Sequence, residues 1–322
     1  MKLLRPYALA AAVAALGAMF LLDIPVQLSD SFAELTASAS ASLPELVSSE
    51  LHGGPYFRPM RRGIAKIVYD LSVGHYYLAY RGFQALQLFV LLLLVVRMVR
   101  ARTDAEIRAL PLLLAMVLGI HTFGGAIYEG LPVNHFLTVL ICVAGAVNLL
   151  QARRTVLTDV TAVLLLLLAM TTIETGLLVA VVLVVGWLAG YRGVSRVAVA
   201  VSVLCVITYL VGRFFVFGGQ TPGLMERSAG YGFAVRSPDE LLALFGDNPL
   251  PFRVYNVVSA VSCVLIGEPR GGVWMFTRDV ADSVAQPWQY ITVLTSTLTT
   301  ALIVRYVARS EEHTSELQSR FG

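Results

Sequence analysis

Long apolar runs are the feature that most constrains the fold of this chain. Leu86–Val96 contains one polar residue, Gln87, and Val160–Met170 contains one, Thr161. Each run lies within a longer apolar stretch of roughly the 20 residues that cross a bilayer as a helix. Backbone polar groups in hydrocarbon must bond to one another, so such segments fold as helices. The sequence therefore predicts an all-α, polytopic membrane protein.

The composition supports this class and excludes others. Hydrophobic residues make up 57% of the chain and charged residues 14%, whereas a soluble domain carries about 25% charged residues. The net charge of +3 is too small to indicate a nucleic-acid partner. The three cysteines, Cys142, Cys205 and Cys263, are isolated in apolar stretches. Neither a zinc knuckle nor a disulfide framework is supported by that spacing.

Hydropathy predicts about eight transmembrane helices, and the charges in their connecting loops predict which ends face the cytoplasm. The predicted spans are residues 7–22, 78–96, 109–123, 135–150, 157–172, 175–190, 197–215 and 289–304. Arginines gather in the short loops on one side of these spans, which the positive-inside rule makes cytoplasmic together with the amino terminus. We expect a bacterial inner membrane, with segments 23–77 and 216–288 outside. A cleaved signal peptide is the alternative for the first run, but the many later spans favour an uncleaved helix.

The outer segments carry helix-start signals. Ser42-Leu-Pro-Glu45 fits a capping box, and Ser237-Pro-Asp-Glu240 repeats it. Pro59 can open another helix, with apolar residues on one face. The opposite face of that helix carries Arg61, Arg62 and Lys66. This pattern predicts an amphipathic helix lying flat on the outer membrane surface, with its basic face near the lipid headgroups.

The carboxyl-terminal residues differ in composition from the rest. Residues 309–319 resemble the translation of a sequencing adapter, and the polar composition breaks abruptly from the preceding apolar run. We therefore expect residues 1–308 to form the transmembrane domain and residues 309–322 to be a non-native tail that packs against nothing.

Glu174 is the first candidate for a functional role. It interrupts the apolar stretch 157–190, and a carboxylate at such a position is costly enough to indicate function. The alternative is the outer turn of a helical hairpin, in which the carboxylate is wetted or caps a helix.

Four further residues in or beside the outer loops could serve chemistry. Asp30 and Glu34 follow the first span, where a carboxylate can take a proton from a hydroxyl; the alternative is a helix cap, since Ser31-Phe-Ala-Glu34 fits a capping box. Arg58 suits phosphate recognition, although a basic interfacial helix also explains it. His121 ends the third predicted span, where a lone histidine is more often structural.

These positions, taken in order, carry a resemblance to a family. The chain resembles the GT-C class of polytopic glycosyltransferases, especially the protein O-mannosyltransferase-like branch. The resemblance covers roughly residues 1–215 and departs from the family where Ile173 replaces a lysine and Asn134 an acid. The matching segments are Asp30-Ser-Phe-Ala-Glu34, Tyr56-Phe-Arg-Pro-Met60, His121-Thr122 and Thr172-Ile-Glu-Thr-Gly-Leu177.

The resemblance implies transfer of a sugar from a polyprenyl-phosphate donor to an acceptor hydroxyl at the outer face. Asp30 and Glu34 would be catalytic, and Arg58, His121 and Glu174 would bind substrate. Arg58 or a divalent cation, Mg²⁺ or Mn²⁺, would stabilise the departing phosphate. A transporter or flippase of a lipid-linked precursor and a non-catalytic membrane protein are the alternatives. The transferase predicts that Asp30, Arg58 and Glu174 converge, with His121 nearby.

Overall fold

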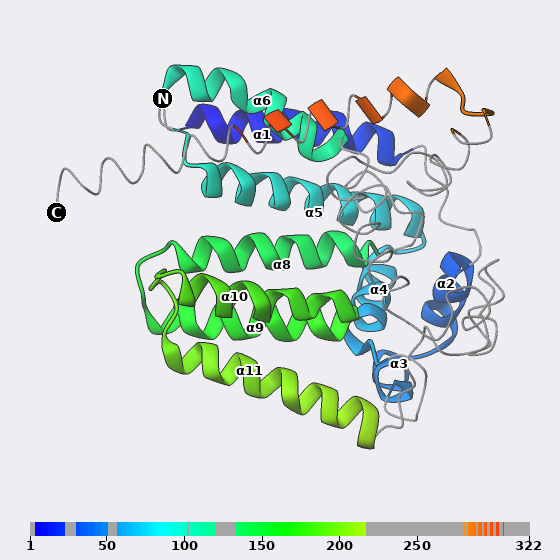
Figure 1. Cartoon of the computed structure of the whole chain (residues 1–322). Coiled ribbons are helices and arrows are strands. Elements are labelled where there is room, and N and C mark those ends of the chain that lie inside the picture. Colours follow the sequence, from blue (N-terminus) through cyan, green and yellow to red (C-terminus); the bar gives the residue numbers. More distant parts are fainter. Residues whose placement is uncertain are drawn as a thin grey trace. The chain divides into compact units, whose positions relative to one another are not determined.

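The computed structural model describes residues 4–22, 30–50, 57–101, 103–119 and 133–216, with scattered residues between 280 and 305. Every regular element within these residues is helical, which confirms the all-α prediction for them (Figure 1). By internal contacts the chain divides into two units, Met1–Pro111 with Ala126–Gly230 and Leu112–Gly125 with Tyr231–Gly322.

The first unit is built from helices that pack side by side. α1 packs on α5, α5 on α8, and α8 on both α9 and α10; α11 closes the row against α9 and α10 (Figure 1). The bounds of these helices are α1 Arg5–Leu21, α5 Tyr76–Val99, α8 His135–Leu150, α9 Val156–Thr172, α10 Leu178–Leu188 and α11 Arg196–Val211. Their apolar side chains form a core that runs through α8, α9, α10 and α11. The predicted spans in this unit therefore coincide with helices.

Two of these helices are candidate membrane spans by length and composition. They are α5, with 24 residues, and the helix Arg196–Val216 formed by α11 and its continuation η3 (Gly212–Val216), with 21 residues. The other apolar helices that the structure describes have 17 residues or fewer. A helix of that length is about 25 Å long, shorter than the roughly 30 Å hydrocarbon core. The number of eight spans stays a prediction.

The second unit is described by few residues. α6 (Asp104–Gly119) begins in the first unit and ends in the second. The described residues within the eighth predicted span, 289–304, are helical. The predicted helix after Ser237 and the carboxyl-terminal tail lie outside the described residues.

Three shorter helices lie at one end of the bundle. α2 (Asp30–Ser40) and α3 (Leu43–Ser49) both contact α4 (Pro59–Leu71), which in turn contacts α5 and α9 (Figure 1). The capping box is confirmed, since the Ser42 N–H donates to Glu45 Oε2 at 2.8 Å. This hydrogen bond holds the pKa of Glu45 below its ordinary value. α4 begins at Pro59, as predicted.

The basic face of α4 differs from the expectation. Its three cations were expected near lipid headgroups, but each meets an acid: Arg61 pairs with Glu34 at 3.1 Å, Arg62 with Glu50 at 2.5 Å, and Lys66 with Asp70 at 2.7 Å. The Lys66 ammonium also donates to the Ser38 carbonyl. α2 and the end of α3 therefore cover part of this face and supply Glu34 and Glu50 to it, whereas Asp70 belongs to α4 itself. The apolar side chains of Ile67 and Leu71 remain exposed.

Candidate functional site

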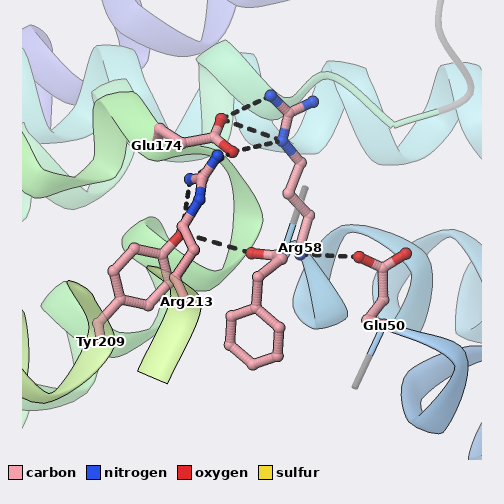
Figure 2. Close-up of polar contacts among 6 residues, drawn as sticks. Glu50, Arg58, Glu174, Tyr209 and Arg213 are labelled. Carbon is pink, nitrogen blue, oxygen red and sulfur yellow. Dashed lines mark hydrogen bonds and ion pairs between the residues drawn. The ribbon is translucent and has the colours of Figure 1, made fainter. Parts of the chain in front are cut away.

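Two arginines from distant parts of the chain meet one glutamate beside α4. Arg58 Nη2 lies 2.5 Å from Glu174 Oε2, and Arg58 Nε lies within 3.2 Å of both carboxylate oxygens. Arg213 Nη1 donates to Glu174 Oε1 at 2.8 Å. Figure 2 shows the carboxylate between the two guanidinium groups. We call Arg58, Glu174 and Arg213 the two-arginine cluster.

The turn between α9 and α10 positions the glutamate. α9 ends where Ile173 takes an extended conformation, and Glu174 then opens a short 3-10 helix, η2 (Glu174–Leu177). Gly176 in η2 lies against the backbone of Ala169 so closely that a Cβ would overlap it. The turn is therefore packed directly onto the last turn of α9, and the glutamate extends from a fixed backbone.

The end of α11 positions the second arginine. Arg213 lies in η3, a π-helical turn that continues α11, and such turns are frequent at functional sites. Tyr209 lies four residues earlier, on the same face of the helix. Its hydroxyl accepts from Arg213 Nη1 at 3.3 Å and donates to the Phe57 carbonyl at 3.4 Å. The tyrosine therefore joins the end of α11 to the residue that precedes Arg58 (Figure 2).

The start of α4 positions the first arginine. The Arg58 backbone N–H donates to Glu50 Oε2 at 2.9 Å, while Glu50 Oε1 holds Arg62. The rings of Phe57 and Tyr209 pack with their centroids 5.9 Å apart. These contacts fix the backbone on both sides of Arg58, and the fixed backbone positions its guanidinium group in the cluster.

The three side chains of the cluster are buried to different extents. The side chain of Arg213 is 4% exposed, that of Arg58 16% and that of Glu174 27%. Burial of the Glu174 carboxyl raises its pKa, but the hydrogen bonds from Arg58 and the charges of both arginines outweigh burial and hold the pKa below its ordinary value. The carboxylate is therefore ionised at neutral pH, and these three residues together carry a net charge of +1.

This arrangement suits an anion better than a divalent cation. Two guanidinium groups offer planar, permanently charged donors that match phosphate geometry. Mg²⁺ and Mn²⁺ prefer several carboxylate or carbonyl oxygens. The carboxylate of Glu174 is already shared by two cations, and the part of the chain that the structure describes holds no group of three metal-binding side chains. Arg58, Glu174 and Arg213 therefore do not fit a divalent cation, the alternative to Arg58 for stabilising the phosphate.

The predicted site residues are distributed as follows. Arg58 and Glu174 converge, as expected, although they are 116 residues apart. Glu34 pairs instead with Arg61 and is buried. Asp30 opens α2, but its side chain lies outside the described residues, as does His121. The catalytic roles of Asp30 and Glu34 stay predictions.

Arg213, Tyr209 and Glu50 were not predicted from the sequence. Arg213 carried a usable signal, because it is a charged residue inside the apolar stretch 197–215, the argument that singled out Glu174. Tyr209 and Glu50 carried none, since their roles depend on contacts between distant segments.

No protein-family profile, curated protein or solved structure matches this chain.

Proposed function

We propose that this protein is a membrane glycosyltransferase that takes a sugar from a polyprenyl-phosphate donor and transfers it to an acceptor hydroxyl at the outer face of the membrane. The observation that carries the proposal is the convergence of Arg58 and Arg213 on Glu174. A donor of this class presents a phosphate anion at the membrane surface, and the two-arginine cluster offers it a matching pair of guanidinium groups.

The positions of the cluster in the chain support an outer-face site. Under the positive-inside rule, the start of α4, the turn between α9 and α10 and the end of α11 all fall on the non-cytoplasmic side. This placement rests on the proposed topology of eight spans in a bacterial inner membrane with a cytoplasmic amino terminus. The lipid tail of the donor would then lie in the outer leaflet, with its phosphate at the level of the cluster.

The proposed reaction divides its tasks between the cluster and an acid. The acceptor oxygen attacks C1 of the sugar, the bond from C1 to the phosphate oxygen breaks, and that electron pair leaves with the polyprenyl phosphate. Arg58 and Arg213 stabilise the charge on the leaving phosphate. The proton of the acceptor hydroxyl passes to the carboxylate of Asp30. Glu174 orients the two guanidinium groups before the donor binds.

The proposal is tested with the full chain in lipid nanodiscs. We expect polyprenyl phosphate to bind, and we expect polyprenyl-phosphate mannose or glucose carrying a radiolabelled sugar to transfer that label to the protein or glycan fraction of added membranes. Asp30→Asn should abolish transfer and leave lipid-phosphate binding and membrane insertion intact, because it removes only the base.

The outcomes separate the proposal from its rivals. Absence of polyprenyl-phosphate binding by the wild type would overturn the proposed function. Movement of intact labelled lipid between the leaflets of a vesicle, with no release of sugar, would establish the transporter instead. Full transfer by Asp30→Asn would remove the role assigned to Asp30, and loss of transfer in Glu34→Gln would then place the base at Glu34.

A further inference from the structure

A second group of buried polar side chains lies between α5 and α8. His135, the first residue of α8, is 1% exposed, and Thr138 and Gln87 are 5% and 6% exposed. Thr138 lies one helical turn after His135 on the same face of α8. Gln87 of α5 donates from Nε2 to Thr138 Oγ1 at 2.7 Å. These three residues therefore form a buried polar group at the start of α8, where α8 meets α5.

Three atoms of this group lack a hydrogen-bond partner among the described residues. They are both ring nitrogens of His135 and the Oε1 of Gln87. A neutral imidazole has one donor and one acceptor nitrogen, and the amide oxygen adds a second acceptor. Leaving such groups enclosed without partners is costly. The group thus has unused capacity for a ligand that both donates and accepts hydrogen bonds, as hydroxyl groups do.

The group lies close to the two-arginine cluster. The positive charges of Arg58 and Arg61 both act on the His135 ring. Because α9 returns antiparallel to α8, its terminal turn η2, which holds Glu174, contacts α8. α5 and α8 run parallel to each other. Gln87 bonds to Thr138, and further along both helices Asn148 bonds to the Leu94 carbonyl. His135 therefore lies at the end of the bundle where the two-arginine cluster is found.

We infer that His135, with Gln87 held by Thr138 one helical turn away, binds hydroxyl groups of the sugar on a lipid-phosphate donor whose phosphate is held by the two-arginine cluster. This inference rests on the proposed function and adds to it the part of the site that distinguishes a sugar-bearing lipid from the bare lipid phosphate. His135 is a substrate-binding residue in this scheme and takes no part in proton transfer.

The test compares two lipids in nanodiscs, polyprenyl phosphate and polyprenyl-phosphate mannose. We expect the wild type to bind the sugar-bearing lipid about 10-fold more tightly, since two added hydrogen bonds of ordinary strength give that factor. His135→Leu should lose this preference and keep its affinity for bare polyprenyl phosphate. His135→Gln, which retains a donor and an acceptor, should keep part of the preference.

Thermal stability separates a binding role from a structural one. His135→Leu removes a buried polar group that has no partner, so its melting temperature should equal or exceed that of the wild type. Ser202→Ala is the matched control: Ser202 of α11 is fully buried, and its hydroxyl also has no partner in the described part of the chain. It lies 11 residues before Arg213, about 16 Å along the helix. This variant should bind both lipids as the wild type does.

The failures of the inference and of the proposed function are distinguishable. If the wild type binds neither lipid, the proposed function fails. If it binds bare polyprenyl phosphate and His135→Leu retains the full preference for the sugar-bearing lipid, only the role of His135 is overturned. A lowered melting temperature in His135→Leu, together with equal weakening of both lipids, would assign His135 to structure and also overturn the inference.

Discussion

The ion pairs on the face of α4 and those at its start differ in their balance of charge. Along the face, three cations each meet an acid of their own; we call these the bracing pairs, Arg61–Glu34, Arg62–Glu50 and Lys66–Asp70. At the start, Arg58 shares Glu174 with Arg213. Balanced pairs join elements and leave little charge for a ligand, whereas two cations on one carboxylate retain attraction for a second anion. The comparison separates a scaffold from a binding site on one helix.

The first prediction contrasts one cation from each group. Arg213→Gln should weaken binding of polyprenyl phosphate about 100-fold, because removal of one member of a buried charge cluster costs several kcal/mol. Lys66→Gln, the matched control, removes the same charge and should change the affinity less than 3-fold, since its partners, Asp70 and the Ser38 carbonyl, make no contact with the cluster. Affinity is measured in nanodiscs by titration of the lipid. Equal weakening by the two variants would mean that the ligand responds to total basic charge and not to the cluster.

The second prediction concerns the shared carboxylate. At pH 7, Glu174→Gln should lower the free energy of unfolding by about 2 kcal/mol, less than a fully buried pair because the side chain is partly exposed.

Lowering the pH should remove the difference in the free energy of unfolding between the wild type and Glu174→Gln. The pKa of Glu174 in the folded protein is lowered from 4.5, so its stabilisation is complete above that pH and is lost as the pH falls through the folded pKa. Thermal unfolding in detergent between pH 7 and pH 3 measures the difference. A gap between the two proteins that stays constant to pH 3 would contradict the assigned role of the carboxylate.

The third prediction tests whether the backbone of η2 holds the cluster together. The new methyl group of Gly176→Ala would overlap the backbone of Ala169, so we expect a loss of about 1–3 kcal/mol in stability. Lipid-phosphate binding should also weaken, because Glu174 shifts. Gly82→Ala in α5 is the control, because a Cβ there meets nothing within 4 Å; it should stabilise the helix slightly. Unchanged binding in Gly176→Ala would show that the cluster does not depend on this packing.

The same contrast shows what could be predicted from the sequence. The helices of the first unit followed from apolar run length, and the starts of α3 and α4 followed from Ser42 and Pro59, because these signals act within a few residues. The pairing of Arg58 with Glu174 was expected only through the family resemblance and a common membrane side. Local pattern alone would have left both residues as helix-terminal charges.

The remainder of the site depends on contacts that no local pattern encodes. The basic face of α4 looked like a headgroup-binding surface, but the covering helices α2 and α3 bring acids to it. His135 showed no ligand-binding spacing in the sequence. Only its burial and its unpartnered nitrogens in the structure indicate a ligand-binding role. Span number depends on helix length in the fold, which hydropathy estimates only coarsely.

The last prediction has the smallest expected effect and tests the scaffold side of the comparison. Asp70→Asn breaks the pair with Lys66 within α4, but Asp70 is 52% exposed and Lys66 keeps its bond to the Ser38 carbonyl. Exposed pairs four residues apart contribute about 0.3–0.5 kcal/mol, so the melting temperature should fall by only a degree or two, about what that energy gives. Lipid-phosphate affinity should stay within the error of the titration, because the pair is balanced and lies apart from the two-arginine cluster. A clear change in affinity would show that the bracing pairs also shape the anion site, and the division of α4 into scaffold and binding site would then be wrong.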